Sequence, residues 1–133
     1  MLSLLNSKKV RSWCFFDFGI SSYPTLILTF FYGAFYAKEI ATNSTIGTSL
    51  WGYALSSASI ICFLILSFIL IFGRSLFKKI KVITFEFFFF LMIFSSFTLF
   101  FFDQNSNHIT PLIIVVISFV SFEIVNLFYN IAL

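Results

Sequence analysis

Four long apolar runs, separated by short polar segments, occupy most of this chain. They cover residues 13–36, 50–72, 80–102 and 110–133. A helix of about 20 apolar residues crosses the hydrocarbon core of a bilayer, whereas the helices of a soluble domain need polar outer faces. The pattern therefore predicts an all-α integral membrane fold, in which residues 1–12 form an N-terminal tail and residues 13–133 form a transmembrane region of four helices.

The distribution of charge orients these helices. Eight residues are basic, and seven of them lie before the first run or around the start of the third: Lys8, Lys9, Arg11, Arg74, Lys78, Lys79 and Lys81. Only Lys38 lies in the other two loops. Because basic loops stay on the cytoplasmic side, we expect a cytoplasmic N-terminus and a cytoplasmic second loop, in a multi-pass protein of the plasma membrane or bacterial inner membrane.

Composition argues against several other classes. Hydrophobic residues make up 60% of the chain and charged residues only 10%, where soluble domains carry roughly 25% charged residues. The basic residues form no patch beside aromatic side chains, so no nucleic acid partner is expected. The solitary His108 and the two separate cysteines predict no metal site, no cofactor and no disulfide. No nucleophile set or pair of carboxylates indicates an enzyme.

Polar residues follow one side of the first helix. At roughly 100° per residue, six positions fall within an arc of roughly 120°: Asp17, Ser21, Thr25, Thr29, Tyr32 and Tyr36. Such a stripe predicts contact with a water-filled cavity, but a hydrogen-bonding seam between helices needs the same residue types. Asp17, about one turn into the span, also fits an interfacial carboxylate that pairs with Lys9 or Arg11.

The fourth run carries the most specific polar signal. Glu123 lies roughly 18 Å along the helix from Pro111, and Asn126 and Asn130 follow on the same face at i+3 and i+7. An ionised side chain at the centre of a membrane helix costs about 2.5–3.5 kcal/mol. This face therefore predicts a functional cavity, and the alternative is a structural network that holds the helices in register.

The second run offers a face for close packing. Gly52, Ser56 and Ser59 fall within an arc of roughly 60°, and small residues at this spacing let membrane helices approach closely. Trp51 and Tyr53 lie near the start of the same run, where aromatic side chains are typical of the membrane–water interface. We therefore expect the small residues to contact another helix and the two aromatics to lie at the outer interface.

Three segments resemble a known family. Residues 13–25 read WCFFDFGISSYPT, residues 50–56 read LWGYALS, and Phe122-Glu123 is followed by Phe128-Tyr129-Asn130. In this order and spacing they resemble helices one, two and four of the vacuole-effluxer-like branch of the major facilitator superfamily. Characterised eukaryotic members of that branch export amino acids from vacuoles.

The resemblance implies a transporter of twelve helices in two halves, with helices one and four lining a central substrate path. This chain then resembles the first four helices of the N-terminal half. Some candidate path residues occupy family-typical positions, and Thr25 and Asn126 join them from the polar faces described above. The full set is Asp17, Ser21, Tyr23, Thr25, Glu123, Asn126 and Asn130.

Departures from the family pattern limit what the resemblance implies. Ile20 replaces the family's Asn, and Arg74 replaces the acidic residue of the loop signature that follows helix two. Lys78 and Lys79 are the remnant of that signature. The last run stops at Leu133, inside what resembles the fourth helix. We therefore expect a truncated secondary transporter that is not active alone.

The expected partners follow from this interpretation. They are the lipid bilayer and either the missing C-terminal transporter helices or another copy of the chain. A complete protein would move a small-molecule solute, such as an amino acid, together with a coupling proton. The alternative comes from a different class: a self-contained four-span structural or assembly subunit, or a homo-oligomer, which would insert stably when expressed alone.

Overall fold

The computed structural model describes residues 8–72, 77–103 and 107–132, and within these ranges every regular element is a helix. The first path through the bundle, here called helix 1, joins four elements that run from Lys8 to Ile40. The elements are α2 (Lys8–Tyr23), η1 (Pro24–Phe30), α3 (Tyr32–Phe35), η2 (Tyr36–Ile40), α4 (Ser44–Phe72), α5 (Phe77–Leu99) and α6 (Ile109–Ala132).

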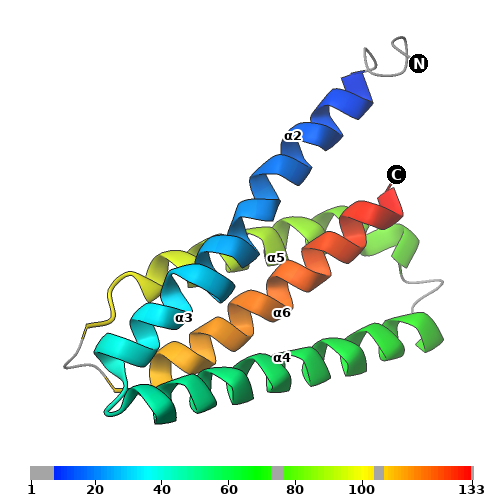
Figure 1. Cartoon of the computed structure of the whole chain (residues 1–133). Coiled ribbons are helices and arrows are strands. Elements are labelled where there is room, and N and C mark those ends of the chain that lie inside the picture. Colours follow the sequence, from blue (N-terminus) through cyan, green and yellow to red (C-terminus); the bar gives the residue numbers. More distant parts are fainter. Residues whose placement is uncertain (1–7, 73–76, 104–106, 133) are drawn as a thin grey trace.

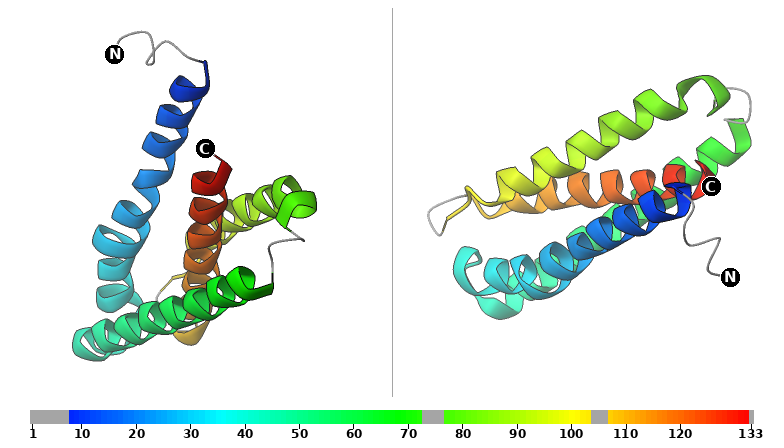
Figure 2. Two further views of the ribbon diagram at one scale, coloured as in Figure 1. Left: turned by 90° about the vertical axis from the view of Figure 1, so that its right-hand side faces the viewer. Right: turned by 90° about the horizontal axis from the view of Figure 1, so that it is seen from above.

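The α6 helix lies at the centre of the bundle. It runs between α4 and α5 and packs against both (Figures 1 and 2). Helix 1 crosses a further side of α6, and its first element, α2, diverges from the bundle toward the N-terminus (Figure 1). The four paths alternate in direction, so the start of helix 1, the end of α4 and the end of α6 lie at one end of the molecule.

Within the described residues, three helices are long and apolar enough to cross a membrane, which confirms that the chain is all-helical with membrane-span-length helices. These spans are Val10–Ile40, Ser44–Ile69 and Ile109–Asn130, judged by length and composition. The third predicted run also forms a helix, α5, but its apolar stretch is the shorter segment Ile83–Leu99. The all-helical architecture is therefore present, with three helices that meet the length of a span.

The first loop is much shorter than expected. Helix 1 continues to Ile40 and α4 begins at Ser44, so the loop predicted over residues 37–49 shrinks to residues 41–43. Asn43 caps α4, because its side-chain oxygen accepts the backbone N–H of Thr45 at 2.9 Å. Hydropathy marks the apolar centre of a span, whereas capping residues determine where the helix begins.

Helix 1 is not a regular α-helix. Pro24 is the first residue of a π-helical stretch, η1, which ends at Phe30. The backbone N–H of Phe31 donates to the carbonyl of Leu26, five residues earlier, at 3.0 Å. Proline lacks an N–H, and its ring clashes with the carbonyl of an α-helical turn, so a wider turn relieves the conflict. One extra residue in a turn rotates all later side chains by roughly 100° relative to an α-helix.

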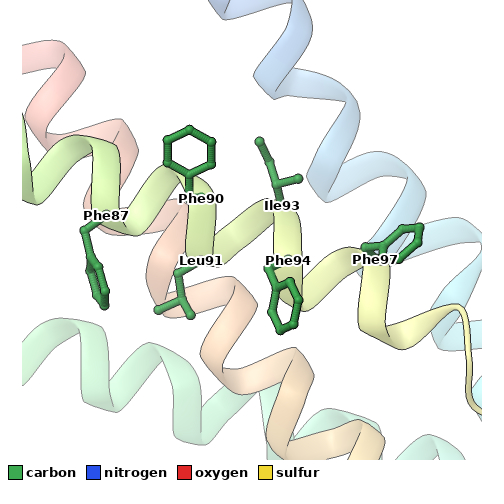
Figure 3. Close-up of a pocket in the computed structure, with 6 residues that line it drawn as sticks. All are labelled: Phe87, Phe90, Leu91, Ile93, Phe94 and Phe97. Atoms are coloured by element: carbon green, nitrogen blue, oxygen red, sulfur yellow. The ribbon is translucent and has the colours of Figure 1, made fainter.

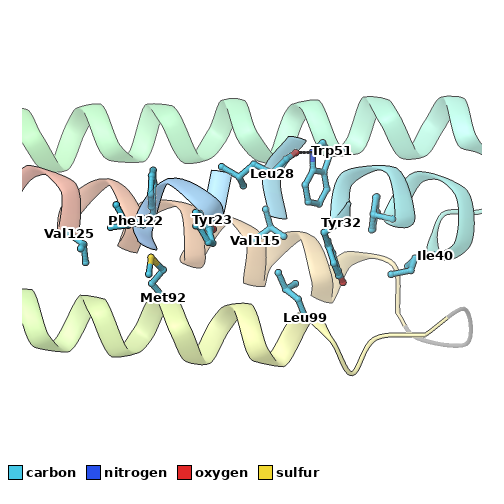
Figure 4. Packing of buried hydrophobic residues seen from close by; sticks show 12 residues of the cluster. Tyr23, Leu28, Tyr32, Ile40, Trp51, Met92, Leu99, Val115, Phe122 and Val125 are labelled. Carbon is cyan, nitrogen blue, oxygen red and sulfur yellow. Dashed lines mark hydrogen bonds between the residues drawn. The ribbon is translucent and has the colours of Figure 1, made fainter. Parts of the chain in front are cut away.

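Trp51 of α4 packs against helix 1 at the π-helical stretch. Trp51 Nε1 donates to the carbonyl oxygen of Leu28 at 3.3 Å (Figure 4). Gly33 makes room for the indole, because a Cβ atom at this position would lie 2.8 Å from Trp51 Nε1. Tyr32 and Tyr36 pack around the same indole, with ring centroids 5.9 Å and 5.7 Å away. Trp51 is thus buried between helices, and its level at the outer interface stays a prediction.

The small residues of α4 are not used as expected within the chain. Gly52, Ser56 and Ser59 are exposed, and a Cβ atom built on Gly52 would meet nothing within 4 Å. The buried stripe of α4 consists instead of Trp51, Ala54, Ala58 and Cys62. The helix packs through the stripe that carries the large indole, because the Leu28 carbonyl and Gly33 provide a place for it.

Candidate functional site

A buried hydrogen-bonded network joins three helices at the level of Tyr23. The Tyr23 hydroxyl donates to Ser118 Oγ at 2.7 Å, and Ser96 Oγ lies 3.2 Å from the same atom. Ser118 is completely buried. The ring of Tyr23 stacks on Phe122 with centroids 4.9 Å apart. Of the candidate path residues, Tyr23 is therefore part of a packing contact between helix 1, α5 and α6.

Sequence reasoning missed both serines of this network. Ser96 follows Ser95, and Ser118 lies in an apolar stretch three residues before Ser121; serines in such stretches are usually satisfied by their own helix. Ser96 also donates to the carbonyl of Met92 at 2.8 Å. The signal in the sequence was Tyr23 itself, because a tyrosine hydroxyl needs a hydrogen-bond partner when it is buried. That signal does not identify which helix supplies the partner.

The polar stripe predicted along helix 1 is divided in two. Its first part is exposed, and the hydroxyls there bond to their own backbone: Ser21 Oγ donates to the carbonyl of Asp17 at 2.6 Å, and Thr25 Oγ1 to that of Ser21 at 3.3 Å. Tyr32 and Tyr36, in the second part, are buried. The π-helical stretch, which contains Thr25 and Thr29, rotates Tyr32 and Tyr36 onto another face, so no continuous polar face exists among the described residues.

Asp17 lies on the exposed face, beside the end of α6. Its neighbour Phe16 stacks on Tyr129 with ring centroids 4.0 Å apart, and the Asp17 carboxylate is close enough to Tyr129 to interact electrostatically. Asp17 makes no ion pair with Arg11, which is also exposed. The interfacial pairing of Asp17 with Arg11 is therefore absent from the structure.

Glu123 lies on the side of α6 that faces α4. It is half-buried, as is Asn126 one turn later, whereas Asn130 is exposed. The Glu123 carboxylate interacts electrostatically with the buried thiol of Cys62. Within the described ranges Glu123 has no hydrogen bond or ion pair, and its oxygens are not among the atoms sealed from solvent. This carboxylate is therefore accessible and uncompensated inside an apolar helix.

The candidate residues form two groups and several isolated positions. Asp17 lies near Tyr129 at the divergent end of helix 1, and Glu123 lies near Cys62 of α4, with Asn126 one turn further along α6. Ser21 and Thr25 face outward and join neither group. Lys78 and Lys79 belong to the first turn of α5, but their side chains lie outside the described part of the structure, so the loop signature stays a prediction.

The surface of α5 also carries an apolar groove. It has a volume of about 560 Å³ and is lined by one helix alone (Figure 3): Phe87, Phe90, Leu91, Ile93, Phe94 and Phe97. These side chains offer no hydrogen-bonding group to a polar solute. Such a face suits a lipid chain better than a transported molecule, so the groove is not a candidate solute site.

The described residues contain no cluster of three or more His, Cys, Asp or Glu side chains that could hold a metal ion. Cys14 is exposed, Cys62 is buried, and both are free thiols. Chemistry at the candidate site therefore depends on a carboxylate, an amide and a thiol.

Comparison with known protein families, curated proteins and solved structures finds no match to this chain.

Proposed function

We propose that this chain is an integral membrane protein of the secondary-transporter class, similar to the first four helices of a major-facilitator protein. In this proposal helix 1 and α6 form part of the wall of a path for a small solute. The N-terminus lies in the cytoplasm, and the membrane is the plasma membrane or a bacterial inner membrane. The observation that carries the proposal is that the Glu123 carboxylate lies within an apolar helix and has no hydrogen bond or ion pair among the described residues.

The Glu123 carboxylate is expensive to keep where it lies. It occurs within the Ile109–Asn130 span, and an ionised group at the centre of a membrane helix costs about 2.5–3.5 kcal/mol. No described side chain compensates it with a hydrogen bond or an ion pair. Carboxylates in such positions commonly bind a proton or a transported cation. An ammonium group could bind Glu123 and also donate to the side-chain oxygen of Asn126.

Further helices are needed for transport in this proposal. Secondary transporters move a solute by rocking two halves around a site near the midplane. The face of helix 1 that carries Asp17 and Ser21 is exposed, so it supports the presence of a second body that covers it. We therefore expect this chain to bind a solute weakly by itself and to transport it only with additional helices, supplied by another chain or another copy.

Solute binding can be tested directly on the detergent-solubilised chain. We expect L-lysine, L-arginine and putrescine to raise its thermal unfolding midpoint in a saturable way, while glucose and acetate do not. Glu123→Gln, which keeps the shape of the side chain, should abolish the response. Glu86→Gln, on the exposed side of α5, is the matched control and should keep it. A response that survives in Glu123→Gln, or no response to any amine, would contradict the proposal.

The second candidate function is a structural or assembly subunit. The observation in its favour is the Tyr23–Ser118–Ser96 network, which uses polar groups to hold helices together rather than to line a path. In that case the chain should be monodisperse in light scattering and long-lived in cells when expressed alone. It should also respond to none of the amines, which distinguishes it from the first candidate.

A further inference from the structure

One side of α5 carries a regular row of exposed apolar side chains, here called the α5 seam. Its members follow one another at alternating steps of four and three residues, and all are 60–72% exposed. They are Ile83, Phe87, Phe90, Phe94 and Phe97. Alternating steps of this kind make a heptad repeat, whose a and d positions line one face of a helix and pack against a second helix in a left-handed supercoil.

The helix uses its other side for packing within the chain. Met92 and Leu99 belong to the buried core (Figure 4), and Ser95 is buried as well. At roughly 100° per residue these three lie roughly opposite the α5 seam. The packing of α5 against α6 therefore leaves the whole seam without a partner in the described structure.

The groove on α5 matches the holes that such a pair of helices needs. In a parallel pair, each a or d side chain of one helix enters a hole formed by four residues of the other. Phe90 of a second copy would enter the hole at positions 87, 90, 91 and 94, and its Phe94 the hole at positions 90, 93, 94 and 97. Together these two holes comprise the six residues that line the groove (Figure 3).

Length and area also favour pairing of this helix. The apolar stretch Ile83–Leu99 is shorter than the three candidate spans, and at 1.5 Å per residue it covers about 25 Å of a hydrocarbon core of about 30 Å. Association is one way in which short membrane helices adapt to a thicker bilayer. Aromatic side chains bury about 150–250 Å² each, so pairing two seams would bury on the order of 1,000 Å², the lower limit of specific interfaces.

We propose that the α5 seam binds the α5 seam of a second copy, as a parallel pair of helices about a two-fold axis along the membrane normal. Copies inserted in the same orientation have parallel α5 helices, as the holes require. Glu86 is exposed beside the seam, and the two-fold axis puts the two Glu86 carboxylates on opposite sides of the pair. A lipid chain requires no particular spacing of side chains, whereas a second helix requires the heptad spacing. The inference requires membrane insertion but not solute binding at Glu123.

Energy transfer between copies tests the association. The full chain is labelled with donor or acceptor at the exposed Cys14 and mixed in phosphatidylcholine vesicles. We expect energy transfer that falls on dilution with lipid, as for a monomer–dimer equilibrium. Phe90→Ala and Phe94→Ala should each weaken association at least about fivefold, because each removes aromatic contacts from both copies. Phe63→Ala is the matched control: Phe63 of α4 is 69% exposed, as is Phe94, and its loss should leave association unchanged.

Disulfide formation tests the register. A two-fold axis brings position 90 of one copy beside position 90 of the other. In a chain that carries Cys14→Ser, Phe90→Cys should therefore give a cross-linked dimer under mild oxidation, whereas Phe63→Cys should not. Far-ultraviolet circular dichroism confirms that each variant is helical.

Three results would overturn the proposal. Energy transfer no greater than that of unassociated chains would show that lipid covers the α5 seam. Association that Phe63→Ala weakens as much as Phe90→Ala, or equal cross-linking of Phe63→Cys and Phe90→Cys, would place the contact elsewhere. Glu123→Gln should leave energy transfer unchanged, so loss of amine binding and loss of pairing are measured separately.

Discussion

The Tyr23–Ser118 hydrogen bond gives an asymmetric prediction for two single substitutions. Tyr23→Phe removes the donor hydroxyl but keeps the ring that stacks on Phe122. Ser118 then still has Ser96 as a partner at 3.2 Å. The loss is therefore one interhelical hydrogen bond, worth about 0.6 kcal/mol on average and up to about 1.7 kcal/mol in membrane proteins.

Ser118→Ala should be more damaging, although it removes a smaller side chain. It leaves the Tyr23 hydroxyl without its acceptor in a buried position. An unsatisfied buried polar group costs about 1–3 kcal/mol. We therefore expect the free energy of unfolding to fall by about 1–3 kcal/mol for Ser118→Ala and by less for Tyr23→Phe. The double variant should resemble Tyr23→Phe, because no orphaned hydroxyl is left.

Reversible unfolding in mixed micelles with increasing sodium dodecyl sulfate, followed by circular dichroism, measures these differences. Ser121→Ala is a matched control, because Ser121 is also buried in α6 but donates only to the carbonyl of Ile117 at 2.7 Å. It should change the free energy of unfolding less than Ser118→Ala does. If Tyr23→Phe proved as harmful as Ser118→Ala, or if the double variant were additive, the network described here would not carry the expected energy.

The remaining predictions concern packing, orientation and the proposed solute site. Gly33→Ala should unfold about 1–3 kcal/mol more easily and shift Trp51 emission, because the new Cβ meets the indole, whereas Gly52→Ala should change stability by less than about 0.5 kcal/mol. Alkaline phosphatase fused after Asn107 should be active and the same enzyme fused after Ser12 inactive, and the reverse pattern would refute the charge-based orientation. Glu123→Gln should abolish the thermal shift with amines.

The helices were predictable from the sequence because a chain of this size has few ways to accommodate four long apolar runs other than as membrane helices. The ends of helix 1 and α4 were not, since Asn43 and the hydroxyls around it extend the helices through polar sequence. The stripe predicted on helix 1 is exposed from Asp17 to Thr29, and only Tyr32 and Tyr36 leave it. An arc drawn with 100° per residue assumes an unbroken α-helix, and the π-helical stretch makes that assumption fail for Tyr32 and Tyr36.

The candidate site shows a similar division between what sequence does and does not reveal. Glu123 could be singled out because a carboxylate in an apolar run is rare, and the structure places it half-buried and without a hydrogen bond or ion pair among the described residues. The partner of Tyr23 could not be found, because Ser118 resembles any other serine in a membrane helix. The packing of Trp51 was hidden for a related reason: it depends on space beside Gly33, a residue on another helix.

The central position of α6 has a consequence for the order of assembly during synthesis. Helix 1, α4 and α5 all precede α6 in the chain, and each of them finds contacts on it. During translation these three helices leave the ribosome before their common partner exists. Until α6 is synthesised, the Tyr23 hydroxyl therefore lacks its hydrogen-bond acceptor, Ser118 Oγ. Slow translation before residue 109 would prolong this exposed state and give membrane proteases more time to act on it.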